Sequence, residues 1–199
     1  SIQGEGRHAG RSAFFIRLAS CKVGCSWCDT KNSWSTDHFK LENVINLSEE
    51  VVSARSHGAA FVVITGGEPL HHNLNELCQA IRKNSNNQEQ LPIPIHLETS
   101  GVDPLSGNPS WITLSPKRHA PPRQELILAC QELKVVIHEK EDLIFAEAIA
   151  NKAKRNNKPL LFLQPGWNNA QGQKLAYEYV LSHSEWSLSM QTHKWLDVL

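Results

Sequence analysis

Residues 61–69 read FVVITGGEP, an apolar run that leads directly into a glycine-rich turn. The run at 61–64 is aromatic and β-branched without a polar interruption, which is typical of a strand buried on both of its faces. A turn rich in Thr, Gly and Glu follows at 65–69. Because the functional side chains of parallel α/β barrels gather where the strands end, this stretch predicts a parallel sheet with a site at its carboxyl edge.

The same arrangement recurs on both sides of this stretch. Six further apolar runs predict strands, at residues 14–18, 93–97, 111–114, 133–137, 160–163 and 186–190. Helical spacing predicts helices at 48–56, opened by a Ser48 cap, and at 74–83, 142–155 and 173–181. We expect surface loops at 84–90 and 101–109, and sparse helical cover between 115 and 133. Strands that alternate with helices indicate βαβ units.

Nearly every predicted strand ends in a polar segment, and these endings decide the expected architecture. They comprise the cysteines after 14–18, ETSG at 98–101, SPK at 115–117, QP at 164–165 and QTHK at 191–194. The predicted strands are too few for the eight units of a closed barrel. We therefore expect an α/β fold of the partial, open parallel β/α barrel type, with a gap that admits a substrate and a single domain over residues 1–199.

Charge and length exclude several classes of protein. The 199 residues carry 20 Lys+Arg and 20 Asp+Glu, a formal net charge of zero. Binding to nucleic acid or to an anionic membrane normally requires a surplus of Lys and Arg, so neither partner is expected. No apolar run approaches the ~20 residues that span a bilayer. The chain opens on SIQGEGR rather than on Met or an apolar leader, so we expect that a few N-terminal residues are missing.

Three of the five cysteines, Cys21, Cys25 and Cys28, crowd into one loop, expected at residues 19–40. Their Cys-x3-Cys-x2-Cys spacing suits a metal site better than a disulfide framework, and the natural setting is a reducing cytoplasm. Three thiolates would leave one iron of a four-iron cluster free to bind a small molecule. The alternative is a structural zinc site completed by a histidine such as His38. No second Cys-x2-Cys pair exists in the sequence, so the cluster is favoured.

At this point the sequence resembles a known family. The cysteine loop followed by a GGEP turn after the next strand is similar to the pattern of radical S-adenosylmethionine (SAM) enzymes. More narrowly, eight segments in order resemble the 7-carboxy-7-deazaguanine synthases. They are SIQGEG (1–6), FIRL (15–18), WCDT (27–30), ITGGEP (64–69), ETSG (98–101), SPK (115–117), QP (164–165) and SMQTHK (189–194).

The resemblance implies a radical SAM barrel and a definite reaction. Family members convert 6-carboxy-5,6,7,8-tetrahydropterin to 7-carboxy-7-deazaguanine with loss of ammonia, in the biosynthesis of 7-deazapurines such as queuosine. The implied cofactors are a [4Fe-4S] cluster, SAM that is regenerated in each turnover, and Mg²⁺. The implied partners are the pterin, an electron donor such as flavodoxin or ferredoxin, and a second copy of the chain in a homodimer.

The resemblance also implies residue roles, and no side chain is assigned a catalytic role beyond the cluster and SAM. The cluster ligands would be Cys21, Cys25 and Cys28, and the Mg²⁺ ligand would be Thr30. SAM contacts would be Trp27, Cys28, Asp29, Gly67, Ser115, Pro116 and Lys117. Substrate contacts would be Ile2, Gln3, Gly4, Glu5, Arg17, Thr65, Gln164, Pro165, Gly166, Trp167 and His193.

The chemistry of these residue types fits such roles. Glycine at 67 lets the backbone approach a ligand closely, and Glu5 suits a guanidine-like N–H edge. Arg17 is expected to be buried at the end of its strand, where a bidentate contact to the substrate carboxylate would offset the cost of burial. Taken alone, Gly67 would be interpreted as part of a turn, Lys117 as a surface charge and Thr30 as a capping or loop residue. His193 has the alternative of simply locking the C-terminal segment.

The remaining cysteines and histidines are assigned no ligand role. Cys78 and Cys130 stand in apolar surroundings and are expected to be inert core thiols. The histidines expected on the surface or in loops include His71, His72, His119 and His138. Two rival functions stay open: another small radical SAM enzyme, such as a glycyl-radical activase, and a non-catalytic zinc or iron-sulfur protein.

Overall fold

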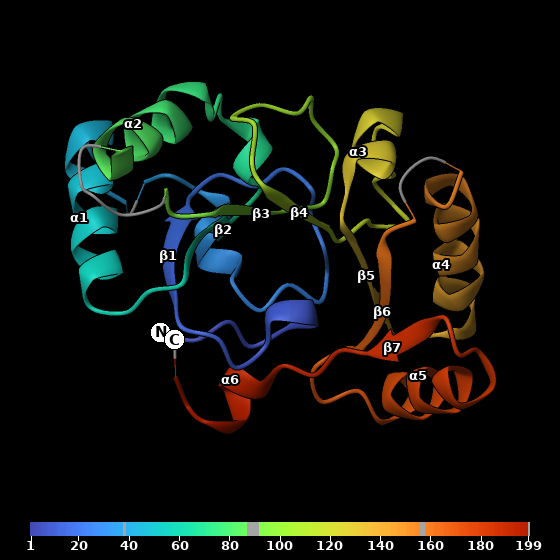
Figure 1. Cartoon of the computed structure of the whole chain (residues 1–199). Helices are drawn as coiled ribbons and strands as arrows, with labels where there is room; N and C mark the ends of the chain where they lie inside the picture. Colours follow the sequence, from blue (N-terminus) through green and yellow to red (C-terminus); the bar gives the residue numbers. More distant parts are fainter. Residues whose placement is uncertain (38, 87–91, 156–157, 199) are drawn as a thin grey trace.

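A computed structural model describes residues 1–37, 39–86, 92–155 and 158–198. Seven parallel strands form one sheet in the order β1 to β7, so that each strand pairs with the next one along the chain. The strands are β1 (Ala13–Leu18), β2 (Phe61–Gly66), β3 (Ile95–Thr99), β4 (Trp111–Leu114), β5 (Glu132–Ile137), β6 (Leu160–Pro165) and β7 (Trp186–Leu188). All seven predicted runs are strands, and the sheet curves into an open barrel, as expected (Figure 1).

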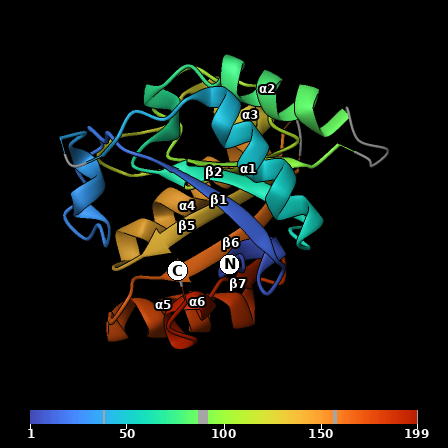
Figure 2. The same cartoon turned by 90° about the vertical axis from the view of Figure 1, so that its left-hand side faces the viewer.

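Helices cover the outer, convex face of this sheet (Figures 1 and 2). They are α1 (Val44–Ser56), α2 (Asn75–Asn86), α3 (Gln124–Ala129), α4 (Lys140–Ala153) and α5 (Ala170–Ser182). The remaining short elements are α6 (Thr192–Trp195) and the 3₁₀ turns η1 (Gly6–His8), η2 (Lys31–Trp34) and η3 (Pro69–His71). Each of α1 to α5 places a fully buried side chain in the main core, namely Val51, Ile81, Leu126, Ala150 and Ala176. Burial of this apolar face, rather than helix propensity, holds the helices in place.

The predicted start of α1 is wrong. The helix begins at Val44, and the Asn43 side chain caps it by accepting a hydrogen bond from the Ile45 backbone N–H at 2.8 Å. Ser48 lies inside the helix, where its hydroxyl donates to the Ile45 carbonyl and accepts from the Asn84 side chain at 2.6 Å. Asn43 satisfies a free N–H group of the first turn, so the helix extends back to it.

Helical cover between 115 and 133 is sparse, as expected, and consists of the short helix α3 at Gln124–Ala129. This helix is shorter than two turns, so its apolar residues do not repeat often enough to show a period. Residues 101–109 form a loop as expected. The helix α2 continues to Asn86, and of the loop expected at 84–90, residues 87–90 lie outside the described part of the chain.

The concave face of the sheet has an apolar end and a polar end. Toward the amino ends of the strands, the rings of Phe61 and His96 stack at 4.2 Å, and His8 packs on His96 and Trp111. Toward the carboxyl ends, register pairs such as Arg17 with Thr65 bring polar side chains onto this face. The polar end of the concave face is therefore where we expect a functional site.

Within the described residues, no helix is long and apolar enough to cross a membrane.

Candidate active site on the concave face of the sheet

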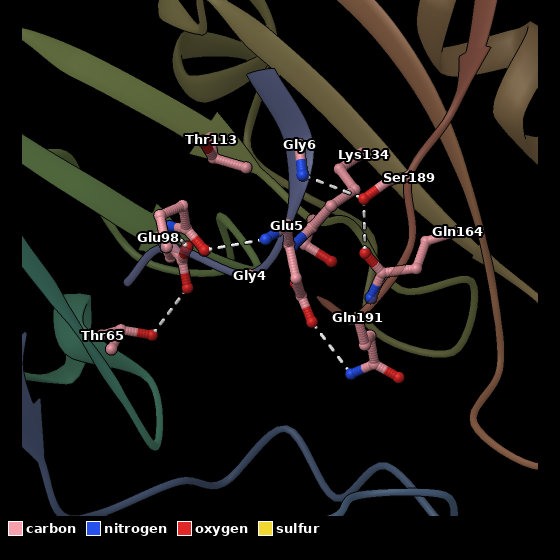
Figure 3. A network of polar contacts seen from close by, with 12 residues as sticks. Gly4, Glu5, Gly6, Thr65, Glu98, Thr113, Lys134, Gln164, Ser189 and Gln191 are labelled. Atoms are coloured by element: carbon pink, nitrogen blue, oxygen red, sulfur yellow. Dashed lines mark hydrogen bonds and ion pairs between the residues drawn. The ribbon is translucent and has the colours of Figure 1, made fainter. Parts of the chain in front are cut away.

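Glu98 on β3 is the centre of one polar group on the concave face (Figure 3). Its carboxylate accepts hydrogen bonds from the Gln3 side-chain amide at 2.7 Å and from the Thr65 hydroxyl at 3.0 Å. Gln3 also accepts from the Glu5 backbone N–H at 3.0 Å. The structure thus brings the predicted substrate residues Gln3 and Thr65 together on the Glu98 carboxylate. The sequence interpretation did not select Glu98, although its charge directly after a predicted strand was a usable signal.

A buried ion pair joins Glu5 to Lys134 on β5. The second oxygen of Glu5 accepts a hydrogen bond from the Gln191 amide at 2.9 Å (Figure 3). Burial by itself raises the pKa of Glu5, but the charge and hydrogen bond of Lys134 outweigh it and hold the pKa at about 2. Glu5 in turn raises the pKa of Lys134 against the opposing effect of burial. Both groups are therefore charged at neutral pH, and Lys134 is a second site residue that the sequence interpretation missed.

The two ends of the chain cross this face and bind each other. The Gly4 carbonyl accepts from the backbone N–H and the hydroxyl of Thr192, at 2.9 and 3.0 Å. A side chain at position 4 would collide with the ring of His193, so Gly4 is required for this close approach. The sequence offers two roles for His193, a substrate contact or a lock on the C-terminal segment. The structure places its ring beside Gly4, in the N-terminal segment that is predicted to contact the substrate.

Gln164 on β6 also lies at this end of the face. Its side-chain oxygen accepts from the Ser189 hydroxyl at 2.8 Å, and the Ser189 oxygen accepts from the Gly6 backbone N–H at 2.9 Å (Figure 3). Gly6 has a φ of +62° and lies against the Glu132 carboxylate, where a side chain would not fit. These contacts fix the path of the N-terminal segment across the barrel opening.

Arg17 lies on the concave face, but the expectation that it is buried is wrong. The side chain is exposed, and its guanidinium lies 4.9 Å from the centre of the Phe15 ring. It makes no ion pair within the described residues. Because β1 is the edge strand of the open barrel, Arg17 stays hydrated while its N–H groups remain available to an anion at the barrel opening.

The three cysteines of the loop follow β1, lie close enough to influence one another's pKa, and form no disulfide. Burial raises the pKa values of Cys21 and Cys25, while Lys117 acts to lower that of Cys25. Cys28 contacts the Thr30 hydroxyl at 3.7 Å. Cys78 and Cys130 are buried in the core as expected, and burial raises their pKa values to about 11 and about 12.

The donor set fits an iron-sulfur cluster better than a single zinc ion. Three soft thiolates are ligands that iron-sulfur clusters prefer. Among the described residues, no three His, Cys, Asp or Glu side chains are arranged to hold one metal ion. A tetrahedral zinc site requires its ligands to converge on one point, whereas each cysteine of a cluster binds its own iron. His38, the proposed fourth zinc ligand, lies outside the described residues.

The GGEP turn after β2 packs against the base of the cysteine loop. A side chain at position 67 would lie 2.3 Å from the Ser20 carbonyl oxygen and 3.1 Å from the Cys21 side chain, so only glycine fits. The buried carboxylate of Glu68 accepts from the Leu70 and Ser100 backbone N–H groups at 3.1 and 2.7 Å. This carboxylate orders the turn.

The predicted SAM segments lie around the same loop. Lys117 donates to the Ser115 hydroxyl at 2.8 Å, and burial lowers the Lys117 pKa against the opposing effect of Cys25, so the alternative of a solvated surface charge does not hold. Asp29 pairs with Lys194, whose ammonium lies 4.9 Å from the centre of the Trp167 ring. Pro116 and Pro165 are buried, and Ile2 forms an isolated bridge with Ser12. Thr30 precedes η2 without a capping side-chain bond.

The four histidines expected on the surface or in loops are exposed or partly exposed, as expected, but they also make specific contacts. His71 accepts from the Lys22 backbone N–H at 2.9 Å, and His72 contacts the Ala19 carbonyl at 2.8 Å. His119 contacts the Val23 carbonyl at 3.0 Å. The rings of His119 and His138 pack against Trp27, at 5.4 and 4.9 Å. Hydrogen bonds to backbone groups follow no residue spacing, so the sequence held no signal for them.

Comparisons with known proteins agree with this geometry. Residues 2–102 match the family model described as "4Fe-4S single cluster domain". The chain is 55% identical to a 7-carboxy-7-deazaguanine synthase of Prochlorococcus marinus, over 100% of this chain and 95% of the relative. It is 43% identical to one of Synechocystis, over 100% and 89%. The crystal structure of QueE from Escherichia coli superposes with a TM-score of 0.77 at 29% identity, covering 96% of this chain and 90% of that one. The chain belongs to the 7-carboxy-7-deazaguanine synthase family.

Proposed function

We propose that this chain converts 6-carboxy-5,6,7,8-tetrahydropterin to 7-carboxy-7-deazaguanine with loss of ammonia, in queuosine-type 7-deazapurine biosynthesis. The observation that carries the proposal is a polar concave face with a free arginine, next to a loop of three free cysteines. The family to which the chain belongs supports the same reaction. The active site would be part of a single domain over residues 1–199, with the cluster loop at 19–40.

The cysteine loop would hold the cofactors. Cys21, Cys25 and Cys28 would ligate a [4Fe-4S] cluster, which together with SAM supplies one-electron chemistry that generates a radical from SAM. Gly67 leaves the space for a close approach at the cluster loop. Lys117, partly buried and close enough to Cys25 to affect its pKa, would pair with a carboxylate or ribose oxygen of SAM. Trp27, Asp29, Ser115 and Pro116 complete this side of the site in the proposal.

The concave face would hold the pterin. The guanidinium of Arg17 is suited to a bidentate contact with the substrate carboxylate, because its N–H groups have no anionic partner in the described residues. Glu98 and the Gln3 amide lie where they could bind the N–H and carbonyl groups of the pyrimidinone ring. Thr65 fixes the orientation of Glu98. Glu5, bonded to Lys134 and Gln191, is charged and retains acceptor capacity for a second N–H group.

The wall of this pocket would be completed by two further segments. Ile2 and Gly4 would add further contacts from the N-terminal segment, and His193 packs against Gly4. The turn formed by Gln164, Pro165, Gly166 and Trp167 closes the side next to the cluster loop, since Gly166 contacts the His138 ring and Lys194 lies over Trp167. In this arrangement water would be excluded from the pterin on the side where the radical forms.

Three further parts of the proposal rest on chemistry and on the family resemblance. Thr30, with its hydroxyl beside Cys28, would bind Mg²⁺ together with the substrate carboxylate, since Mg²⁺ takes few protein oxygens and keeps several waters. The three-cysteine loop, whose thiols form no disulfide, supports a reducing cytoplasm as the site of action. The electron donor would be a flavodoxin or ferredoxin, and the chain would act as a homodimer.

Anaerobic reconstitution tests the proposal. The protein, loaded with iron and sulfide, is incubated with the carboxytetrahydropterin, SAM, Mg²⁺ and a reductant, and products are identified by mass spectrometry. We expect 7-carboxy-7-deazaguanine and about four irons per chain. SAM cleavage without this product would favour another radical SAM enzyme such as a glycyl-radical activase. One zinc per chain and no SAM cleavage would favour a non-catalytic metal protein.

A further inference from the structure

The backbone of residues 22–24 forms an arc between the first two cysteines of the cluster loop. Gly24 has a φ of +72°, a conformation that glycine adopts without strain. The path of this arc determines how Cys21 and Cys25 are oriented relative to each other. Groups that orient metal ligands in this way affect how firmly the metal is held.

Two backbone groups of the arc are bonded to histidines. The Lys22 N–H donates to Nε2 of His71 at 2.9 Å, and the Val23 carbonyl contacts Nε2 of His119 at 3.0 Å. On the N-terminal side of the arc, Cys21 and Ser20 are fixed instead by backbone bonds to Trp34 and Ser33, at 3.2 and 2.8 Å. The path of the arc itself thus depends on side chains from other elements.

The hydrogen-bond partners define the state of each ring. Nε2 of His71 faces an N–H donor, so it must be the acceptor nitrogen, and its hydrogen must be on Nδ1. Nδ1 contacts the carboxylate of Asp103, which accepts that hydrogen and fixes the ring. Nε2 of His119 faces a carbonyl oxygen, so it must be the donor. The two histidines therefore supply one acceptor and one donor to the two sides of the arc.

We propose that His71, aligned by Asp103, and His119 are positioning residues that hold residues 22–24 in the conformation that sets the orientation of Cys21 and Cys25 as cluster ligands. The inference rests on the proposed function, because it assigns these residues a role toward the cluster. It adds outer residues, which hold the ligand loop without being ligands themselves and to which no contact with SAM or the pterin is assigned. Outer residues of this kind typically change metal retention by about 10- to 100-fold when they are replaced.

Leu and Gln variants at positions 71 and 119 separate hydrogen bonding from packing. Gln can place an acceptor oxygen or a donor nitrogen near the position of Nε2, whereas Leu fills similar space without either. His71→Leu and His119→Leu should release iron to a chelator about 10-fold faster than the wild type. His71→Gln and His119→Gln should stay near the wild-type rate. His57→Leu is the matched control, because His57 is an exposed histidine bonded to a backbone carbonyl of α1, away from the loop.

Hydrogen exchange of the holoenzyme supplies a second readout that does not depend on activity. A peptide covering residues 19–25 should exchange about 2- to 10-fold faster in His71→Leu than in the wild type, as expected for the loss of one hydrogen bond. If a Leu variant fails to fold, Asp103→Ala carries the test, since it frees the His71 ring without a change at the loop. It should accelerate both iron release and exchange.

The results distinguish the positioning role of the histidines from the proposed function of the protein. Wild-type rates of iron release in both Leu variants and in Asp103→Ala would overturn the positioning role. Gln variants as impaired as the Leu variants would also overturn it, because the ring rather than its hydrogen bond would then matter. A wild-type protein that assembles no four-iron cluster would instead overturn the proposed function, and this inference with it.

Discussion

The buried ion pair between Glu5 and Lys134 makes a strong prediction about stability. The Lys134 and Glu5 side chains are 6% and 15% exposed, so neither charge has much access to water. Lys134→Met would leave the Glu5 carboxylate buried with only the Gln191 hydrogen bond. Removing one partner of a buried pair typically costs about 3 to 5 kcal/mol, because the remaining charge is not compensated.

The pKa of Glu5 gives an independent magnitude. The shift of this pKa from 4.5 to about 2 corresponds to about 3 kcal/mol, at about 1.4 kcal/mol for each pH unit. Because the pKa is lowered in the folded state, this contribution is present above pH 4.5 and is lost as the pH falls toward 2. The free energy from the pKa shift agrees with the typical cost of removing one partner of a buried ion pair, and both apply at neutral pH.

Thermal and urea unfolding at pH 7 test this prediction. Lys134→Met should melt roughly 6 to 20 °C below the wild type, at about 2 to 4 °C for each kcal/mol in a chain of this length. The double variant Glu5→Gln/Lys134→Met removes both charges and should recover much of the loss. In Lys134→Met only the weaker effects of Gln191 and His193 still oppose burial, so the Glu5 pKa rises relative to the wild type and the stability deficit should shrink as the pH falls toward 4. A double variant no more stable than Lys134→Met would refute the reasoning, because the two residues would then act independently.

Three further predictions address the cluster, the substrate and the apolar end of the barrel. Cys25→Ala should lower the iron content well below about four per chain and abolish SAM cleavage; full iron content would contradict the ligand assignment. Arg17→Ala should keep the cluster and some uncoupled SAM cleavage but raise KM for the pterin about 10-fold or more, and an unchanged KM would exclude a carboxylate contact. Burial lowers the pKa of His96 to about 3, so the unfolded state takes up a proton first as the pH falls below about 6.5, and the wild type should lose about 2 kcal/mol between pH 7 and pH 5. His96→Phe should not show this loss in urea unfolding, and equal losses in both proteins would rule out His96 as its source.

The strands could be predicted from the sequence because parallel strands with both faces covered are nearly continuous apolar runs. Phe61–Gly66 is the clearest of them, with four residues at 0 or 1% exposure. Helix ends were harder to predict. Asn43 and Ser48 have similar intrinsic capping preference, and only the observed bond from Ile45 to Asn43 decides between them.

The candidate site could be located from the motifs but not assembled from them. The segments with Gln3, Thr65 and the cysteines are local, so their residue types and spacing are visible in the sequence. The pair of Glu5 and Lys134 joins residues 129 positions apart, which no local pattern can indicate. A lysine within the apolar run at 133–137 was the available signal, since a charge in a buried strand requires a partner.

Burial was also misjudged where it depends on the position of a strand within the sheet. Arg17 follows the apolar residues Phe15 and Ile16, so the sequence suggests a buried position. The strand lies at the edge of an open barrel, where the side chain reaches solvent. Strand order depends on long-range pairing, and the pattern within one strand does not contain it.

The most direct test of the central claim measures two products in one anaerobic reaction. The reconstituted protein is given SAM, reductant, Mg²⁺ and excess 6-carboxy-5,6,7,8-tetrahydropterin, and 7-carboxy-7-deazaguanine and 5′-deoxyadenosine are quantified together by mass spectrometry. If SAM is regenerated in each turnover at the concave face, 7-carboxy-7-deazaguanine should accumulate in excess over 5′-deoxyadenosine. Accumulation of 5′-deoxyadenosine without any 7-carboxy-7-deazaguanine would contradict the account.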